Sequence, residues 1–306
     1  MTVLQSIEEL KRVPGPVALA IGVFDGLHLG HQEVIRAAQE HAAQHRGTAV
    51  VMTFEPHPLR VLRPAAAPKL LNGVGYQGRL LGRMGIEWSL LCPFTETTAA
   101  TPAEDFVGEL VQACRPLGCI SVGYTWVFGK DRRGNIHSLM DLGQRHDFAV
   151  YGVPPIRVAG EVVSSTLIRD AVSAGDLARA SRMLGRPYGL FGRVIEGCRL
   201  GRELGFPTAN LRPEGDLLPP FGVYAVRIEI DGEWLRGIAN LGVRPTVEND
   251  GIPTLEVHVF DWSGDLYAQD LEVRLEAFIR PEMKFAGVEA LKEQITADVL
   301  QARSLR

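Results

Sequence analysis

The sequence predicts an α/β domain with a doubly wound parallel sheet, followed by a small antiparallel β-barrel domain with a C-terminal helix. Three observations lead to this prediction. In the first half of the chain, strand-like apolar runs alternate with segments of helical spacing. From about residue 185 onward, short β-rich runs follow one another with turn residues between them, a pattern typical of a small antiparallel barrel or sandwich. The final segment, residues 288–303, carries one apolar stripe at helical spacing.

Length and composition narrow the class of protein. The chain has 306 residues, which suits about two domains, and its formal net charge of −4 gives no electrostatic case for binding nucleic acid. It has no long uncharged apolar run, and its first residues lack the basic start and apolar core of a signal peptide. The four cysteines form no Cys-x-x-Cys pair and are expected to be reduced and mostly buried. We therefore expect a cytoplasmic protein that binds neither nucleic acid nor membrane.

The first half is predicted to alternate strands with helices. Strands are expected at residues 17–24, 48–54, 88–94, 119–124 and 148–153, and helices at 32–46, 76–84 and about 101–114. Thr101, Pro102 and Glu104 predict the start of the last of these helices, with Thr101 as its cap and Glu104 completing a capping box. Strands that alternate with helices pair in parallel, and such sheets bind ligands at the carboxyl ends of their strands.

After a predicted helix at residues 177–184, the pattern changes from alternating strands and helices to successive short strands. Asp231-Gly232 is a strong hairpin signal, and Ser263-Gly264-Asp265 marks another turn. We therefore place a domain boundary near Gly185, with one domain at residues 1–184 and the other at 185–306. The predicted barrel strands are residues 188–195, 222–230, 233–240, 254–262 and 271–279.

The first stretch that indicates chemistry is residues 21–31, Ile-Gly-Val-Phe-Asp-Gly-Leu-His-Leu-Gly-His. It joins a strand to a helix start, where backbone N–H groups and the helix dipole can hold phosphate. His28 and His31 can donate hydrogen bonds to charge that develops on a phosphoryl group. A metal site at this pair lacks an acidic or thiol ligand at a fitting spacing, and two solvated histidines remain an alternative. Three glycines allow close backbone approach to a ligand: Gly22, Gly26 and Gly30.

A second stretch, Val163-Ser164-Ser165-Thr166-Leu167-Ile168-Arg169, also opens a helix. Ser164 or Ser165 can cap that helix, and Arg169 lies about one turn further on. Hydroxyls, N–H groups and one guanidinium form a second phosphate cradle in this interpretation. The alternative is an ordinary capped helix with a surface arginine.

A third stretch, residues 201–210, reads Gly-Arg-Glu-Leu-Gly-Phe-Pro-Thr-Ala-Asn. Two glycines and a proline predict a loop that presents Thr208 and Asn210 together. Their side-chain oxygens can coordinate Mg²⁺ or meet a phosphate. The alternative is an ordinary turn that is followed by polar residues.

Taken together, these strings resemble one family, the bacterial bifunctional riboflavin kinase/FMN adenylyltransferases, or FAD synthetases. Residues 22–31 are similar to its Gly-x-Phe-Asp-Gly-x-His-x-Gly-His string, which contains the His-x-Gly-His motif of nucleotidyltransferases. Residues 163–169 resemble its Ile-Ser-Ser-Thr-x-x-Arg string, and residues 201–210 resemble the Gly-Arg-x-Leu-Gly-Phe-Pro-Thr-Ala-Asn string of riboflavin kinases. The resemblance extends from about residue 17 to 303, and further matching segments are residues 219–225, 240–246, 255–261 and 279–285.

The resemblance implies two activities: phosphorylation of riboflavin to FMN with MgATP in the barrel, and transfer of AMP from ATP to FMN in a Rossmann-like nucleotidyltransferase domain. The implied partners are ATP, riboflavin, FMN and FAD, with Mg²⁺ as cofactor, in a monomer or weak homo-oligomer. The implied catalytic residues are Glu256, a general base, with His28 and His31, and the implied metal ligands are Thr208 and Asn210. The binding residues it implies are Gly22, Phe24, Asp25, Gly26, Gly30, Ser164, Ser165, Thr166, Arg169, Gly201, Arg202, Thr208, Asn210, Arg244, Arg280, Glu282 and Phe285.

One segment departs from the family pattern. Residues 123–129 read Gly-Tyr-Thr-Trp-Val-Phe-Gly, where the family usually has Gly-x-Asp-Phe-Arg-Phe-Gly. Thr125 and Val127 replace an acidic or amide residue and an arginine. This departure favours a rival function, a riboflavin kinase whose adenylyltransferase is weakened or lost. Two more rival functions are a flavin-binding regulator without turnover, which has no need of a base beside a metal site, and a zinc hydrolase built on His28 and His31.

Overall fold

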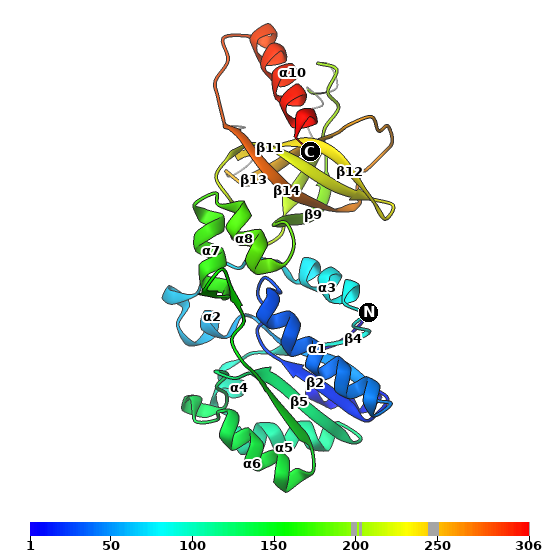
Figure 1. The fold of residues 1–306 in the computed structure, drawn as a ribbon, viewed down its shortest axis with the longest axis vertical. Coiled ribbons are helices and arrows are strands. Elements are labelled where there is room, and N and C mark those ends of the chain that lie inside the picture. Colours follow the sequence, from blue (N-terminus) through cyan, green and yellow to red (C-terminus); the bar gives the residue numbers. More distant parts are fainter. Residues whose placement is uncertain (197–200, 202–203, 244–250, 306) are drawn as a thin grey trace. The chain divides into compact units, whose positions relative to one another are not determined.

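The computed structural model describes residues 1–196, 201, 204–243 and 251–305. The chain divides into two compact units, shown as a ribbon in Figure 1. The first unit contains Met1–Pro68 and Gln77–Ser164, and the second contains Lys69–Tyr76 and Ser165–Arg306. The second unit therefore includes helices that precede Gly185, so the boundary at residues 184 and 185 stays a prediction.

The first unit contains a parallel sheet of six strands. The predicted doubly wound α/β fold is confirmed, and the five predicted strands all occur. Every residue of the central strand β2 is buried, which explains its continuous apolar run. The strand order is β1 (Thr2–Leu4), β4 (Trp88–Pro93), β3 (Thr48–Glu55), β2 (Val17–Ile21), β5 (Leu117–Gly123) and β6 (Ala149–Val153).

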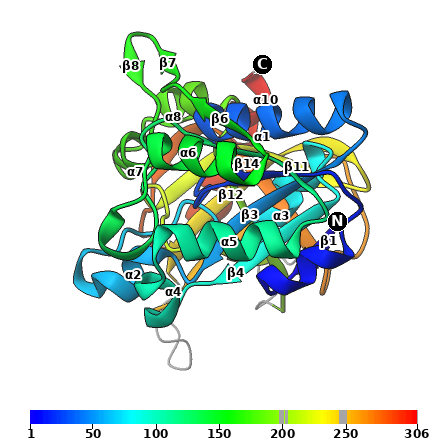
Figure 2. The same cartoon turned by 90° about the horizontal axis from the view of Figure 1, so that it is seen from below.

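Helices cover both faces of this sheet. Helix α1 (Leu29–Gln44) and helix α5 (Ala103–Ala113) lie on opposite sides of the strands in Figure 1, and Figure 2, seen from below, shows α5 in front of them. Helix α6 (Ile136–His146) shares the core of α5. The strand order reverses at β2, which lies between β3 and β5. The crevice at such a reversal, outside the carboxyl ends of the strands, is the usual ligand site of this fold.

The start of α5 differs from the prediction. Pro102 is its N-cap, without a side-chain cap, whereas Thr101 ends the preceding helix α4 (Glu96–Ala100) and donates through Oγ1 to the carbonyl of Thr97 at 3.1 Å. Glu104 lies 3.6 Å from Arg145. The predicted capping box is therefore wrong, because the unpredicted α4 ends at this point. The first unit also contains α2 (Pro58–Leu62), a hairpin of β7 (Arg157–Val158) and β8 (Glu161–Val162), and the 3₁₀ turns Ile7–Arg12, Pro64–Ala66 and Lys130–Arg132.

The second unit contains the predicted barrel, which is closed and antiparallel. One of its strands, β10, begins within the stretch for which the sequence predicts a loop. The strands run in the order β10 (Ala209–Pro213), β13 (Pro253–Val259), β12 (Glu233–Val243), β11 (Gly222–Ile230), β14 (Asp270–Pro281) and β9 (Gly189–Ile195). The unit also contains helices α7 (Ser165–Ser173), α8 (Leu177–Leu184) and the C-terminal α10 (Val288–Ser304).

Residues 69–76 belong to the barrel unit although they come from the first half of the sequence. Helix α3 (Val74–Arg83) begins there, and the ring of Tyr76 stacks on that of Phe191 at 5.6 Å between centroids. The Tyr76 hydroxyl donates to Oε1 of the fully buried Glu272 at 3.0 Å. Burial, followed by the charge of Glu272, raises the pKa of Tyr76 to about 12.

Three cysteines, Cys92, Cys114 and Cys119, are buried free thiols, as predicted. Burial raises the pKa of Cys92 to about 11 and that of the other two to about 12. Cys198 lies outside the described residues. Within the described ranges, no helix combines the length and apolar character needed to cross a membrane.

Candidate active sites

The turn after β2 takes an uncommon backbone conformation. Phe24 and Leu27 have φ angles of 53° and 44°, in the left-handed region, and Gly26 has a φ of 82°. Non-glycine residues rarely occupy this region unless neighbouring contacts hold them there. The predicted glycine-rich turn is thus observed, but two bulky residues share the left-handed conformation. Both Phe24 and Leu27 are buried, so the packing of their side chains holds the turn in place.

Side-chain donors hold the carbonyls of this turn. Thr53 donates through Oγ1 to the Val23 carbonyl at 2.9 Å. Gln77 donates through Nε2 to the carbonyls of Val23 and Phe24 at 3.3 and 3.1 Å. With the carbonyls held in this way, the strained backbone is kept in one conformation.

His28 is the N-cap of α1, and its Nδ1 accepts a hydrogen bond from the backbone N–H of His31 at 3.2 Å. A neutral imidazole that accepts at Nδ1 carries its proton on Nε2. A side chain at Gly30 would approach the His28 ring to about 3.2 Å, so glycine leaves room for this ring. The sequence suggested that both imidazoles can donate hydrogen bonds, and the structure limits the donor of neutral His28 to Nε2.

His31 stacks on His28 with 3.5 Å between ring centroids. Burial, and secondly the neighbouring His28, lower the pKa of His31 well below 6.5. Within the described part of the chain, the buried Nδ1 of His31 has no hydrogen-bond partner. Phe24 meets the His31 ring edge-on at 5.3 Å. His31 is therefore a neutral imidazole at neutral pH, and its Nδ1 has no partner among the residues that the structure describes.

The second predicted phosphate cradle is divided between the two compact units. Ser164 is the last residue of the first unit, and Ser165, Thr166 and Arg169 lie on α7 of the second unit. Arg169 donates through Nε to the carbonyl of Lys69 at 2.9 Å. Combined use of these residues with His28 stays a prediction.

Segment 123–129, whose sequence differs from the family pattern, begins at the end of β5, the neighbour of β2 in the sheet. Trp126 stacks on Phe128 at 4.5 Å and packs against the core of the first unit. One face of the indole is thus covered by protein. Thr125 is exposed, so its substitution for an acidic residue does not alter the core.

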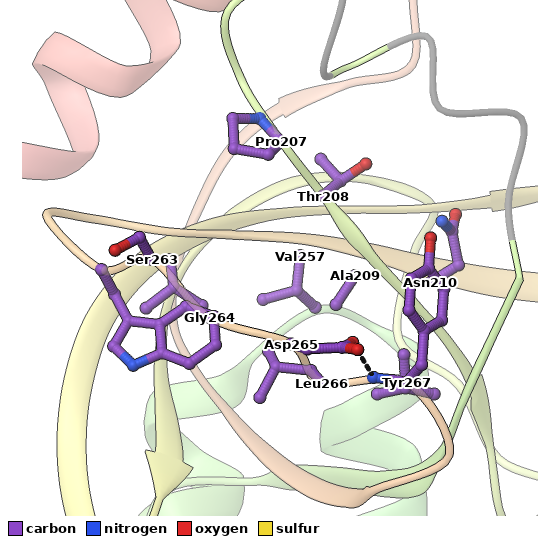
Figure 3. Close-up of a pocket in the computed structure, with 13 residues that line it drawn as sticks. Pro207, Thr208, Ala209, Asn210, Val257, Ser263, Gly264, Asp265, Leu266 and Tyr267 are labelled. Atoms are coloured by element: carbon purple, nitrogen blue, oxygen red, sulfur yellow. Dashed lines mark hydrogen bonds between the residues drawn. The ribbon is translucent and has the colours of Figure 1, made fainter.

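The barrel unit carries two clefts that share Thr208. Cleft A, about 480 Å³, lies between residues 207–210 and 262–267. Figure 3 shows the residues that line it, with Thr208 and Asn210 from the first segment and Asp265 and Tyr267 from the second. Cleft B, about 220 Å³, lies between the barrel and α10.

A row of paired residues crosses five neighbouring strands of the barrel. Asn210 of β10 is the Cα partner of Glu256 of β13, which is also the partner of Asn240 of β12. Asn240 pairs with Val223 of β11, which in turn pairs with Arg280 of β14. Four of the five line cleft B, whereas Asn210 lines cleft A. The predicted base and the predicted metal ligand are therefore neighbours on adjacent strands.

Most of the residues predicted for the kinase meet around cleft B. A side chain at Gly242 would overlap the carboxylate of Glu282, so glycine makes room for Glu282 at this edge. Arg202 and Arg244 lie outside the described residues. The predicted residues that line cleft B are Gly201, Thr208, Glu256, Arg280, Glu282 and Phe285.

Sequence reasoning missed three polar residues of cleft B: Asn240, His258 and Asp298. His258 donates through Nδ1 to the carbonyl of Pro207 at 2.8 Å, next to Thr208. Because side chains alternate along a strand, His258 shares a face with Glu256, and this spacing could have identified it. Asp298 lies on α10, and only the tertiary fold brings it to the cleft.

Comparison with known proteins agrees with this geometry. A model of the FAD synthetase domain matches residues 10–167, and a model of riboflavin kinase matches residues 184–306. The chain belongs to the bifunctional riboflavin kinase/FMN adenylyltransferase family. Relatives of that name from Pseudomonas fluorescens and Escherichia coli K12 are 37% and 36% identical. The alignments cover 100% and 99% of this chain and 98% and 97% of the relatives.

The chain is also similar to a solved structure over its whole length. A crystal structure described as a macrolide-efflux protein from Streptococcus pneumoniae is similar with a TM-score of 0.81 and 30% identity, and the match covers 100% of this chain and 99% of that one. Because the family's domain models match both halves of this chain, the kinase-only alternative is not favoured.

Proposed function

We propose that the second unit phosphorylates riboflavin to FMN with MgATP, and that the FAD synthetase domain transfers AMP from ATP to FMN, releasing pyrophosphate. The pairing of Asn210 with Glu256 carries the proposal for the kinase. It brings an oxygen ligand suited to a hard cation beside a carboxylate, on a barrel wall with a cleft at each side. Thr208 lines both clefts, which suits a group transferred from a nucleotide in cleft A to riboflavin in cleft B.

The kinase step follows from these neighbours. The residues present fit Mg²⁺, because Thr208 and Asn210 offer a hydroxyl and an amide oxygen, and Mg²⁺ favours a few protein oxygens together with phosphates. When bound, Mg²⁺ supplies charge that offsets the negative charge of the transferring phosphoryl group. Glu256 accepts the proton of the terminal ribityl hydroxyl as the hydroxyl oxygen attacks the γ-phosphorus of ATP, and the bond to the β–γ bridging oxygen breaks to release ADP. His258 holds the Pro207 carbonyl and thereby the position of Thr208.

The adenylyl step uses the turn after β2. His28 donates its Nε2 hydrogen to the α-phosphate oxygen, where negative charge develops as the FMN phosphate attacks. Neutral His31 stacks against His28 and limits its ring rotation. Ser164, Ser165 and Arg169 receive the departing pyrophosphate in this proposal. The substrates are small molecules, and we also propose a cytoplasmic monomer or weak homo-oligomer.

The test is a product assay in which riboflavin and MgATP are supplied and FMN and FAD are separated. Wild-type protein should form both. Glu256→Gln should lower FMN formation by about 10²–10⁴-fold, the usual contribution of a general base, and leave FAD formation from supplied FMN nearly unchanged. His28→Ala should do the reverse. Formation of FMN without FAD at saturating FMN would contradict the adenylyltransferase, and equal loss of both products in each variant would contradict the separation of sites.

A further inference from the structure

The ion pair of Arg280 and Asp298 forms part of the wall of cleft B. Only 3% of Asp298 is exposed. Arg280 donates through Nε to Oδ1 and Oδ2 of Asp298 at 3.1 and 2.9 Å, and its Nη2 lies 2.7 Å from Oδ2. A carboxylate held this closely offsets most of the charge of the guanidinium toward a molecule in the cleft.

Further contacts fix the orientation of this pair. Gln294, one helical turn before Asp298, donates through Nε2 to Asp298 Oδ1 at 2.8 Å. Arg280 also donates through Nη1 to the carbonyl of Pro281 at 2.9 Å. Among the described residues, these contacts use Nε and one hydrogen on each Nη atom of Arg280. A guanidinium has five N–H donors, so two are left for a ligand in cleft B.

Arg280 and Glu256 stand at opposite ends of the part of the cross-strand row that lines cleft B. Three strand spacings separate them, about 14 Å along the barrel wall and less across its curvature. If Glu256 meets the terminal hydroxyl of riboflavin, Arg280 lies toward the flavin ring, whose carbonyl oxygens are uncharged acceptors. A charge-masked donor suits such an acceptor better than it suits a phosphate.

We propose that Asp298 is a positioning residue that aims Arg280 and masks its charge, so that cleft B takes up uncharged riboflavin and releases its anionic product FMN. The inference rests on the proposed function of cleft B. The phosphate adds about −1.5 to −2 charges to the product. An unmasked guanidinium would still donate to a ring carbonyl, but it would also attract this phosphate and retain FMN.

The experiment uses the full chain with His28→Ala, so that FMN is not consumed by adenylyl transfer. The riboflavin KM and the FMN inhibition constant of the kinase reaction are measured with and without Asp298→Asn, which keeps the size of the side chain and an acceptor for Arg280. We expect the inhibition constant to fall about three- to tenfold, as for one charge acting over about 10–14 Å in a partly screened site. The riboflavin KM should change by less than about twofold, since a neutral substrate gains little from the unmasked charge.

Asp261→Asn is the matched control. Asp261 forms another close ion pair with α10, to Arg303 at 2.7 and 2.8 Å, and neither residue lines cleft B. This variant should leave both constants unchanged. If Asp298 served only to anchor the helix, its substitution would shift KM and the inhibition constant together, and that result would overturn the proposal.

Two further variants keep the test decisive if Asp298→Asn does not fold. Arg280→Gln leaves the carboxylate of Asp298 unmasked and should raise the ratio of FMN inhibition constant to riboflavin KM. The double variant should return this ratio toward the wild-type value. An unchanged ratio in all variants would refute charge masking, whereas absence of FMN formation by the parent protein would refute the proposed kinase itself.

Discussion

Asn210 and Glu256 face each other as Cα partners in the antiparallel pairing of β10 with β13. A slip of β10 by one residue would turn Asn210 to the opposite side of the barrel wall, because strand side chains alternate. The pairing of β10 with β9 on its other edge closes the barrel and opposes such a slip. The register of one short strand therefore determines whether the predicted metal ligand and the predicted base act at the same place.

The first prediction concerns His258, which fixes the start of β10 through the Pro207 carbonyl. The amide nitrogen of asparagine occupies nearly the position of Nδ1 in histidine, and that of glutamine nearly the position of Nε2. His258→Asn should therefore keep the hydrogen bond and the wild-type KM for MgATP. His258→Gln should lose the bond and raise this KM about two- to tenfold, as for one neutral hydrogen bond. Steady-state kinetics of FMN formation distinguish the two, and equal behaviour of both variants would rule out the Nδ1 contact.

The second prediction concerns the buried partners of residues 69–76. Tyr76→Phe removes the hydroxyl that donates to Glu272, and Arg274 remains as a donor to Glu272 Oε1 at 2.9 Å. A buried carboxylate that loses a donor costs about 1–3 kcal/mol. The free energy of unfolding of the barrel unit, measured by denaturant titration, should therefore fall by this amount. Tyr188→Phe loses hydrogen bonds to the carbonyls of Leu71 and Leu217 and provides a comparison in which no charge is left short of a donor. No shift for Tyr76→Phe would mean that its hydroxyl does not stabilise the unit.

The sequence predicted the two architectures because local patterns determine them. Alternating strands and helices imply parallel pairing, and successive short strands with turns imply a small antiparallel barrel or sandwich, of which the structure has the barrel. It missed β10, since Asn210 and Pro213 are poor strand formers and only pairing with β9 and β13 makes that segment a strand. It missed the association of residues 69–76 with the barrel for a similar reason. The contacts of Tyr76 lie 115 and 196 positions away in the chain, beyond any local pattern.

Some site residues could likewise be predicted from local sequence, and others could not. Strings such as residues 201–210 indicated Thr208 and Asn210 by resemblance, and the barrel brings both to cleft A. Asp298 had no such signal, because an aspartate in an amphipathic helix is usually a solvated residue. Its role depends on Arg280, which lies 18 positions earlier on a different element.

The third prediction concerns pH. The pKa of His31 is lowered well below 6.5 in the folded protein, so its imidazole stays neutral there while the unfolded chain takes up a proton near pH 6.5. Between these two pKa values the unfolded state binds more protons, so the free energy of unfolding rises with pH. The stabilisation is complete above about pH 7 and is lost as the pH falls below about 6.5. His31→Asn should flatten the pH dependence of the free energy of unfolding in this range, measured by calorimetry. The same substitution at the exposed His137 should not. A parallel profile for His31→Asn and wild type would contradict the buried neutral imidazole.

The last prediction concerns Gln77, which we expect to be a positioning residue for adenylyl transfer. Its amide holds the carbonyls of Val23 and Phe24, and the left-handed Phe24 leads into the helix cap at His28. Gln77→Leu leaves these carbonyls with one donor fewer, and each neutral hydrogen bond contributes about 0.5–1.5 kcal/mol. FAD formation from FMN should therefore fall about two- to tenfold in kcat, because the turn no longer holds the His28 ring in one place.

Gln39→Leu is the matched control for this experiment. Gln39 also donates through Nε2 to a backbone carbonyl, that of Met84, at 2.7 Å, but this carbonyl lies at the far end of α3 from the turn. Both variants lose a side-chain amide that donates to backbone carbonyls, two carbonyls for Gln77 and one for Gln39, so a general loss of stability would lower FAD formation in both. A selective fall in kcat with Gln77→Leu, at unchanged FMN formation by the barrel, is the expected result. If both variants or neither lost FAD formation, the turn would not depend on Gln77 for its catalytic geometry.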